Sequence, residues 1–170
     1  MDNSFFAYLQ RLELMAFFSA YPLLYATIHV IAGNSKREAL KKLPPLLPFA
    51  YALVGILYLG LQLKNLYPDY SVENIRLTIQ QPWLVIWGLL SILFWIPVLA
   101  KRPVLSLLHS LVFFFFLVRD LFLQTFQSSA DKNVVRNDMK IYADSLLLNL
   151  AAFILVTLIF FLFARYKKQK

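Results

Sequence analysis

The chain contains no cysteine in its 170 residues. Disulfide bonds, thiolate metal sites, a cysteine nucleophile and thioether attachment of haem are therefore excluded. Catalytic signatures are also missing, since there is no GxSxG, no HExxH, no P-loop and no pair of aspartates inside an apolar segment. Ser106 and His109 are spaced as a nucleophile and its base could be, but they lack a third group and an oxyanion donor. The sequence therefore predicts a protein that is not an enzyme.

Charged residues are scarce, at 15% of the chain, whereas 60% of the residues are apolar. A soluble domain carries about 25% charged and about 45–50% apolar residues. Too few polar side chains are present to cover a globule in water. The composition therefore predicts an integral membrane protein.

Five apolar segments, each of about 19–20 residues, divide the chain. At a rise of about 1.5 Å per residue, a helix of this length matches a hydrocarbon core of about 30 Å. Backbone groups in lipid must bond within their own segment, which a helix achieves. We therefore predict an all-α polytopic membrane protein, a single domain formed by a bundle of five transmembrane helices. The expected helices are Leu14–Ala32, Pro44–Leu63, Pro82–Ala100, Pro103–Phe122 and Ser145–Ala164.

Prolines and aromatic residues refine these boundaries. Pro44, Pro82 and Pro103 each open a segment, where a missing N–H costs nothing. Pro22 instead lies inside the first segment, and it predicts a kink or a local unwinding there. Ser71 is the expected N-cap of a short helix in the link between the second and third segments. Trp83 and Trp87 are expected at the outer membrane boundary.

Basic residues alternate between the two sides of the predicted helices. One side carries ten of them and a single acid, Glu38. The ten are Lys36, Arg37, Lys41, Lys42, Lys101, Arg102, Arg165, Lys167, Lys168 and Lys170. The other side carries seven basic residues and eight acids. The positive-inside rule then places the N-terminus outside and the C-terminus in the cytoplasm, in what we expect to be a bacterial inner membrane.

The net charge of +8 follows from this alternation. We interpret it as a signal for orientation, with some attraction to anionic lipid. A nucleic-acid partner is not expected, because no soluble face interleaves basic and aromatic residues. No cleavable signal peptide is expected either, since a basic N-terminal region is missing.

One polar group is expected at the outer ends of the helices. Arg119 and Asp120 follow a run of four phenylalanines near the end of the fourth segment. Glu13, Asp144 and Asn149 are predicted at a similar depth. Two interpretations stay open: the charges reach headgroups and water separately, or Arg119 pairs with Asp144 or Glu13 in a cluster.

A second polar group lies deeper and toward the cytoplasmic side. Its members are Tyr21, Tyr25, His29, Tyr51, Tyr58, Ser106 and His109. These side chains could bond helix to helix, or they could line a pocket for a lipid, a sterol-like or a quinone-like molecule. A third possibility is a b-type haem with His29 and His109 as axial ligands, because the two histidines are predicted at comparable depths.

Three functions are consistent with this sequence. The leading one is a non-enzymatic membrane protein that binds a lipid or hydrophobic small molecule, or that serves as a subunit of a membrane complex. The alternative is a small oligomeric channel or carrier that uses the outer charged cluster. The third is a haem-binding electron carrier. The expected partners are membrane lipids, further copies of the chain or other membrane subunits.

Overall fold

A computed structural model of the chain describes residues 3–126 and 132–168. All regular structure in those ranges is helical, which confirms the all-α fold class. Asp2, Asp131 and Lys170, which entered the charge pattern, lie outside the described residues. The elements are α1 (Asn3–Phe18), α2 (Tyr21–Asn34), α3 (Glu38–Lys41), η1 (Pro44–Leu46), α4 (Leu47–Leu66), α5 (Val72–Thr78), α6 (Pro82–Leu90), η2 (Ser91–Trp95), α7 (Pro97–Ala100), α8 (Pro103–Phe126) and α9 (Lys132–Lys168).

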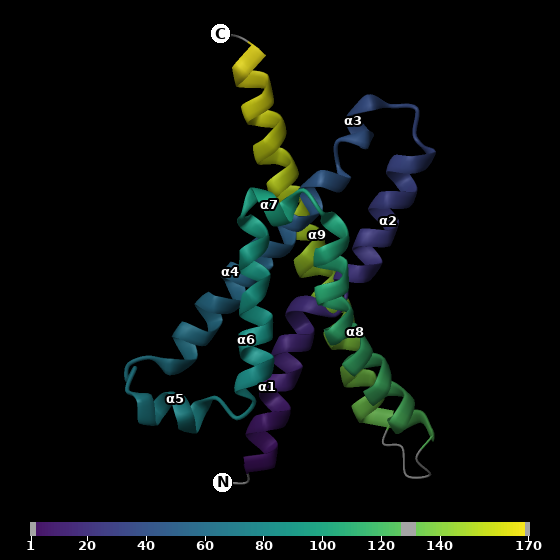
Figure 1. The fold of residues 1–170 in the computed structure, drawn as a ribbon. Helices are drawn as coiled ribbons and strands as arrows, with labels where there is room; N and C mark the ends of the chain where they lie inside the picture. Colours follow the sequence, from purple (N-terminus) through teal and green to yellow (C-terminus); the bar gives the residue numbers. More distant parts are fainter. Residues whose placement is uncertain (1–2, 127–131, 169–170) are drawn as a thin grey trace.

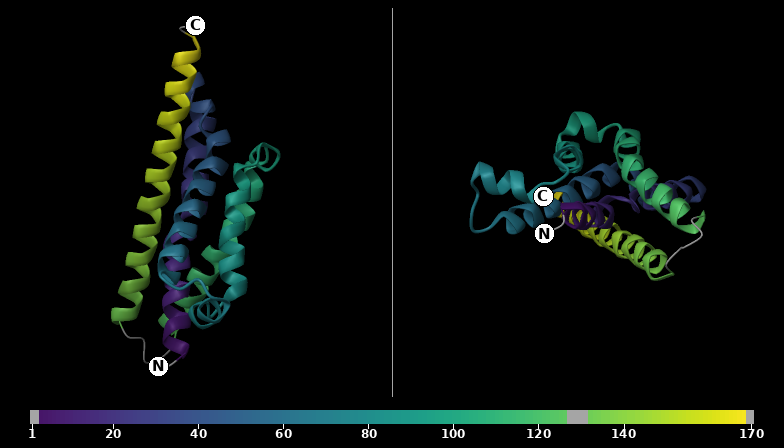
Figure 2. Two further views of the ribbon diagram at one scale, coloured as in Figure 1. Left: turned by 90° about the vertical axis from the view of Figure 1, so that its left-hand side faces the viewer. Right: turned by 90° about the horizontal axis from the view of Figure 1, so that it is seen from below.

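The helices form an elongated bundle with the two chain termini at opposite ends (Figure 1). The lower end in this view holds the N-terminus and α5, and the upper end holds the C-terminus and α3. Helix α9 runs along the whole bundle beside α1 and α4, while α6 and α8 form a shorter hairpin (Figure 2). The upper parts of α9 and α2 therefore extend beyond the top of this hairpin.

Four helical stretches are long and apolar enough to cross a membrane, and a fifth is added if one bent pair forms a single crossing. The four stretches are Glu13–Asn34, Glu38–Leu66, Pro103–Leu123 and Met139–Tyr166. They correspond to the first, second, fourth and fifth predicted segments. The bent pair joins α5 to α6 and η2 at an angle of 96°.

The prediction of one continuous third helix over Pro82–Ala100 is wrong. The α-helix ends at Leu90, a 3₁₀ stretch follows, and Ile96 is extended with φ −70° and ψ 125°. Pro97 explains the second break, because a proline excludes the residue before it from the α conformation. A new helical turn, α7, starts at Pro97. The third segment is thus three short pieces.

The first segment is interrupted as Pro22 predicted. Helix α1 ends at Phe18, a turn occupies Ser19 and Ala20, and α2 begins at Tyr21. Pro22 has no N–H to donate, so it stands in the first turn of α2, where that donor is not needed. The chain therefore changes direction in the middle of its first apolar stretch.

The fifth helix is longer than the predicted Ser145–Ala164. Helix α9 has 37 residues and begins at Lys132, which corresponds to a length of about 55 Å. No glycine or proline occurs after Pro103, so nothing in the polar stretch before Ser145 stops the helix. Helix α8 likewise continues to Phe126.

The core is built from aromatic rings around Phe18, at the end of α1. Its ring lies 4.8 Å from that of Phe113, stacked, and 5.5–5.6 Å from those of Tyr51 and Tyr58, edge on. Gly55 and Gly88 let their backbones approach this core closely. A Cβ on Gly55 would overlap the Ser91 hydroxyl, so α4 can pack against η2 only with glycine there.

Candidate functional site

The residues predicted to line a pocket lie mostly in the closed core of the bundle. Tyr21, Tyr51, Tyr58 and Ser106 each have a relative exposure of 0%. The hydroxyls of Tyr21 and Tyr51 form hydrogen bonds with side chains of α8, as the interpretation of helix-to-helix bonding expects.

His109 of α8 joins three helices through both nitrogens of its ring. Nδ1 lies 2.8 Å from the Tyr51 hydroxyl of α4, and Nε2 lies 2.9 Å from the backbone oxygen of Trp87 in α6. A carbonyl only accepts, so Nε2 carries the proton and the Tyr51 hydroxyl donates to Nδ1 of the neutral ring. The indole of Trp87 stacks on the imidazole, with centroids 4.8 Å apart and planes 5° apart.

The change from α-helix to 3₁₀-helix in the third segment creates the acceptor for His109. In a continuous α-helix the Ser91 N–H would donate to the Trp87 oxygen. Here it donates to the oxygens of Gly88 and Leu89 instead. The imidazole N–H of His109 replaces the lost backbone donor. Trp87, which was predicted at the membrane boundary, is therefore a half-buried part of the helix contacts.

Tyr21 makes the second connection between helices. Its hydroxyl lies 2.8 Å from Oγ of Ser106 in α8. The Ser106 hydroxyl donates to the backbone oxygen of Pro103 at 2.7 Å, so Tyr21 is the donor in the bond between the two side chains. Tyr58 differs, because its buried hydroxyl has no hydrogen-bond partner within the described part of the chain.

The two histidines differ in their surroundings. His29 of α2 is half-buried and stacks on Tyr25, with centroids 4.3 Å apart. Its Nε2 has no hydrogen-bond partner among the described residues. His109 has both ring nitrogens engaged, so axial ligation of a haem iron by both histidines would require breaking one of its hydrogen bonds. The arrangement of the side chains does not fit a bis-histidine haem.

The outer polar cluster is arranged differently from the prediction. Arg119 is exposed and forms no ion pair with Glu13 or Asp144 in the described structure, so neither predicted pair is present. Asp120 instead pairs with Arg11 of α1 at 2.8 Å, and both side chains are about one-quarter exposed. The Arg11 guanidinium also lies 5.3 Å from the centre of the Phe116 ring.

The other members of that cluster have separate partners. Glu13 accepts a hydrogen bond of 3.4 Å from the amide of Asn65 in α4. Asp144 is exposed on α9. Asn149 is buried at 1% exposure, one turn above Ser145. Proximity in predicted depth therefore did not bring these side chains into one site.

Asn149 and Ser145 satisfy the backbone where the first segment is broken. The Asn149 amide donates to the backbone oxygen of Phe17 at 2.8 Å. The Ala20 N–H donates to the Ser145 hydroxyl at 3.2 Å. An interrupted helix leaves such groups without intrahelical partners, and in an apolar setting each must find another one. Helix α9 provides them.

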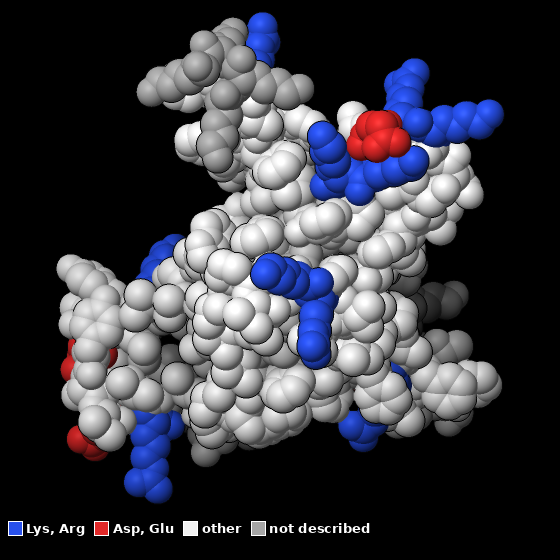
Figure 3. All heavy atoms as spheres, turned by 45° about the horizontal axis from the view of Figure 1, so that its top comes forward, with Lys and Arg blue, Asp and Glu red and all other residues white. Residues whose placement is uncertain are grey.

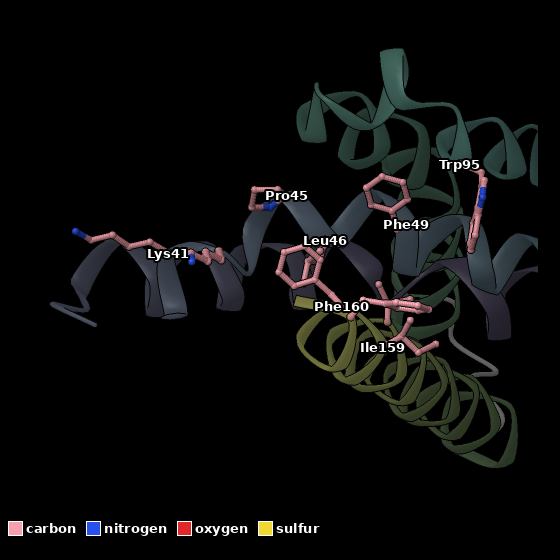
Figure 4. Close-up of a pocket in the computed structure, with 10 residues that line it drawn as sticks. Lys41, Pro45, Leu46, Phe49, Trp95, Ile159 and Phe160 are labelled. Carbon is pink, nitrogen blue, oxygen red and sulfur yellow. The ribbon is translucent and has the colours of Figure 1, made fainter. Parts of the chain in front are cut away.

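An apolar groove of 620 Å³ lies between α4 and α9. We call it the α4–α9 groove. Its lining residues are Lys41, Lys42, Pro45, Leu46, Phe49, Trp95, Val156, Ile159, Phe160 and Phe163. Figure 4 shows Lys41 at one end of the groove and Trp95 at the other, with Phe49 and Phe160 between them.

The groove combines apolar walls with charge at one end only. All of its lining residues apart from the two lysines and Trp95 have purely hydrocarbon side chains. Sites for small molecules are concave, mostly apolar and fixed by a few polar groups, and this groove has that composition. Ile159, Phe160 and Phe163 of its lining lie in the C-terminal half of α9, the part of this helix that extends beyond the hairpin of α6 and α8 (Figure 2).

None of the seven predicted pocket residues lines this groove. His109 does line a smaller hollow of 490 Å³, beside Trp87 and Phe94. The groove residues were missed because the upper half of α9 is apolar on every face, so its sequence does not distinguish a groove from a lipid-facing surface. The pair Lys41–Lys42, separated from Pro44 and Pro45 by a single leucine, was a signal that could have pointed to this end of the groove.

No family model, no curated protein and no solved structure matches this chain. Among the described residues, no three histidine, aspartate or glutamate side chains are grouped as ligands for a metal ion. Functional conclusions therefore depend on the geometry of the chain itself.

Proposed function

We propose that this protein is an integral membrane protein that crosses the bilayer five times, with its N-terminus outside and its C-terminus in the cytoplasm of a bacterial cell. The main support is α9. The apolar stretch Met139–Tyr166 is the most hydropathic of the candidate spans, yet only 17% of its most apolar window is buried in the bundle. An exposed face of this kind needs lipid or another membrane protein to cover it.

The third crossing is formed by α6 and η2. Nine α-helical and five 3₁₀ residues rise by about 24 Å together, which is less than a core of about 30 Å. Trp83, near its outer end, is more than half exposed and suits the outer interface. The short α5, bent away by 96°, lies along the outer surface in this arrangement.

Within the membrane, the protein binds a lipid or another hydrophobic molecule in the α4–α9 groove and carries out no chemistry on it. The groove itself is the observation that carries this function: 620 Å³ of apolar space with cations at one end. We assign a structural role to the polar side chains of the core. Tyr21 of α2 and Tyr51 of α4 each form a hydrogen bond with a side chain of α8, and His109 is one of the two partners.

Native mass spectrometry of the protein released from mild detergent tests this function. We expect a lipid-sized molecule to remain bound to the wild-type chain. Ile159→Trp fills the groove and should remove most of that molecule. Leu158→Trp is the matched control, because Leu158 is exposed on the same helix and does not line the groove.

Two results would contradict the proposal. Equal retention in both variants would place the bound molecule elsewhere. A second protein subunit that is lost only with Ile159→Trp would show that the groove belongs to an assembly of membrane subunits instead.

A further inference from the structure

We propose that the α4–α9 groove selects an anionic phospholipid, whose phosphate lies at Lys41 and Lys42 while its acyl chain follows the groove toward Trp95. This inference rests on the proposed function and adds the class of ligand. The lining has cations at only one end, and Figure 4 shows the apolar side chains of η1, α4 and α9 following from that end. A molecule with one anionic head and a long apolar tail matches this order.

The acyl chain alone cannot provide selectivity. Leu46, Phe49, Ile159 and their neighbours offer a hydrocarbon surface, but the tails of the surrounding lipids are equally apolar. Moving a chain from bilayer to groove therefore gains little. Preference for one lipid over another must come from the headgroup, which is where the lysines lie.

The charges around the lysines favour an anionic headgroup. The link between α2 and α4 also carries Lys36 and Arg37, and Glu38 is its one acid. Figure 3 shows basic side chains grouped around an acidic one at one end of the molecule. A basic group close to a membrane attracts anionic lipid by about 1 kcal/mol for each lysine or arginine.

Glu38 competes for one of the two lysines. Its carboxylate lies 3.0 Å from Nζ of Lys41, and both side chains are more than half exposed. An exposed pair of this kind is weak, at about 0–1 kcal/mol, so a phosphate can replace the carboxylate. Lys42 has no ion pair with any residue in the described ranges and is free to bind directly.

The experiment places the full-length protein in nanodiscs that contain equal amounts of phosphatidylglycerol and phosphatidylcholine, and measures the lipids that stay bound after release. Wild-type protein should be enriched in phosphatidylglycerol. In the double variant Lys41→Gln/Lys42→Gln, the enrichment in phosphatidylglycerol should fall roughly 5-fold for each lysine removed. Lys101→Gln/Arg102→Gln removes the same charge from the link between α7 and α8, away from the groove, and should leave the enrichment unchanged.

Two further arms sharpen the result. Glu38→Gln frees Lys41 from its carboxylate and should raise the enrichment. Inorganic phosphate at millimolar concentration should not displace the bound lipid, because it gains nothing from the apolar walls. Displacement by inorganic phosphate would overturn the inference in favour of a site for soluble anions.

The outcomes separate this inference from the proposed function. Lipid that is retained without headgroup preference, or a preference lost equally in both double variants, would overturn the inference and leave a groove that binds hydrophobic molecules. An absence of bound lipid in every variant would overturn both. All variants are at exposed positions, and equal unfolding temperatures would show that the fold is retained in each.

Discussion

His109 holds α4, α6 and α8 together because each of its two ring nitrogens forms a hydrogen bond with a neighbouring helix. Nε2–H donates to the Trp87 oxygen where α6 becomes a 3₁₀-helix, and Nδ1 accepts a hydrogen bond from the Tyr51 hydroxyl. Buried polar groups cost little only when all are satisfied. A histidine in an apolar chain is in this case explained by packing rather than by a cofactor.

Replacement of His109 should therefore destabilise the bundle. His109→Phe keeps the ring against Trp87 but leaves the Tyr51 hydroxyl and the Trp87 oxygen unpaired, at a cost of about 1–3 kcal/mol. In the Tyr51→Phe background the same replacement should cost less, because the hydroxyl is then absent. Thermal or denaturant unfolding in mild detergent measures the difference. Equal costs in the two backgrounds would show that the hydrogen bond contributes nothing.

The ion pair between α1 and α8, Arg11–Asp120, gives a second prediction at this scale. The pair should show a coupling energy of about 0.2–1 kcal/mol in a double-mutant cycle with Arg11→Gln and Asp120→Asn, as expected for partly exposed charges. The matched cycle on Arg119 and Asp144 should be additive within about 0.3–0.5 kcal/mol, since these two form no pair. Coupling in the second cycle alone would contradict the observed pairing.

At the scale of helices, two helix breaks leave backbone groups without their usual partners, and side chains of neighbouring helices bond to these groups. The break at Ser19 and Ala20 is satisfied by Ser145 and Asn149 of α9, and the one at Ser91 by His109 of α8. An apolar environment allows a broken helix only where such partners exist. These repairs explain why polar residues occur inside otherwise apolar helices.

Gly55 provides the test of helix packing. Gly55→Ala would bring Cβ against the Ser91 hydroxyl and within 3.1 Å of Cγ1 of Ile92, and such overpacking costs about 1–3 kcal/mol. Gly60→Ala is the control on the same helix, because a Cβ there meets nothing within 4 Å. That change should be neutral or stabilising, since alanine is the better helix former. Unfolding in detergent compares the two, and equal stability would show that α4 and η2 can separate without cost.

At the scale of the whole molecule, the proposed orientation places α5 outside and α3 inside the cell. The absence of cysteine makes this direct to measure, because each introduced cysteine is the only thiol. Tyr70→Cys should react with a membrane-impermeant maleimide in intact cells, whereas Ala39→Cys should react only after the cells are opened. Both positions are exposed. Labelling of both from outside would show that α4 does not cross the membrane and would contradict the arrangement of five crossings.

Much of the helix pattern could be inferred from the chain alone. The four long apolar stretches, the interruption near Pro22 and the N-cap at Ser71, whose hydroxyl accepts from the Asn74 N–H at 3.2 Å, all follow from local features. Apolar length, a missing N–H and a short polar side chain act on the few residues around them. Their effects therefore do not depend on how the helices are later packed.

The sites depended on contacts that no local pattern specifies. Arg11 and Asp120 are 109 positions apart. Arg119 was expected to pair with Asp144 or Glu13 only because their predicted depths were similar. The partner of a side chain is set by the rotation of each helix about its axis. In an apolar bundle that rotation follows from a few close contacts, such as those of Gly55 and Phe18. The groove beside α9 is likewise decided by packing. Phe49 of α4, Trp95 of η2 and Phe160 of α9 come from three separate elements, and only their arrangement leaves a space between them.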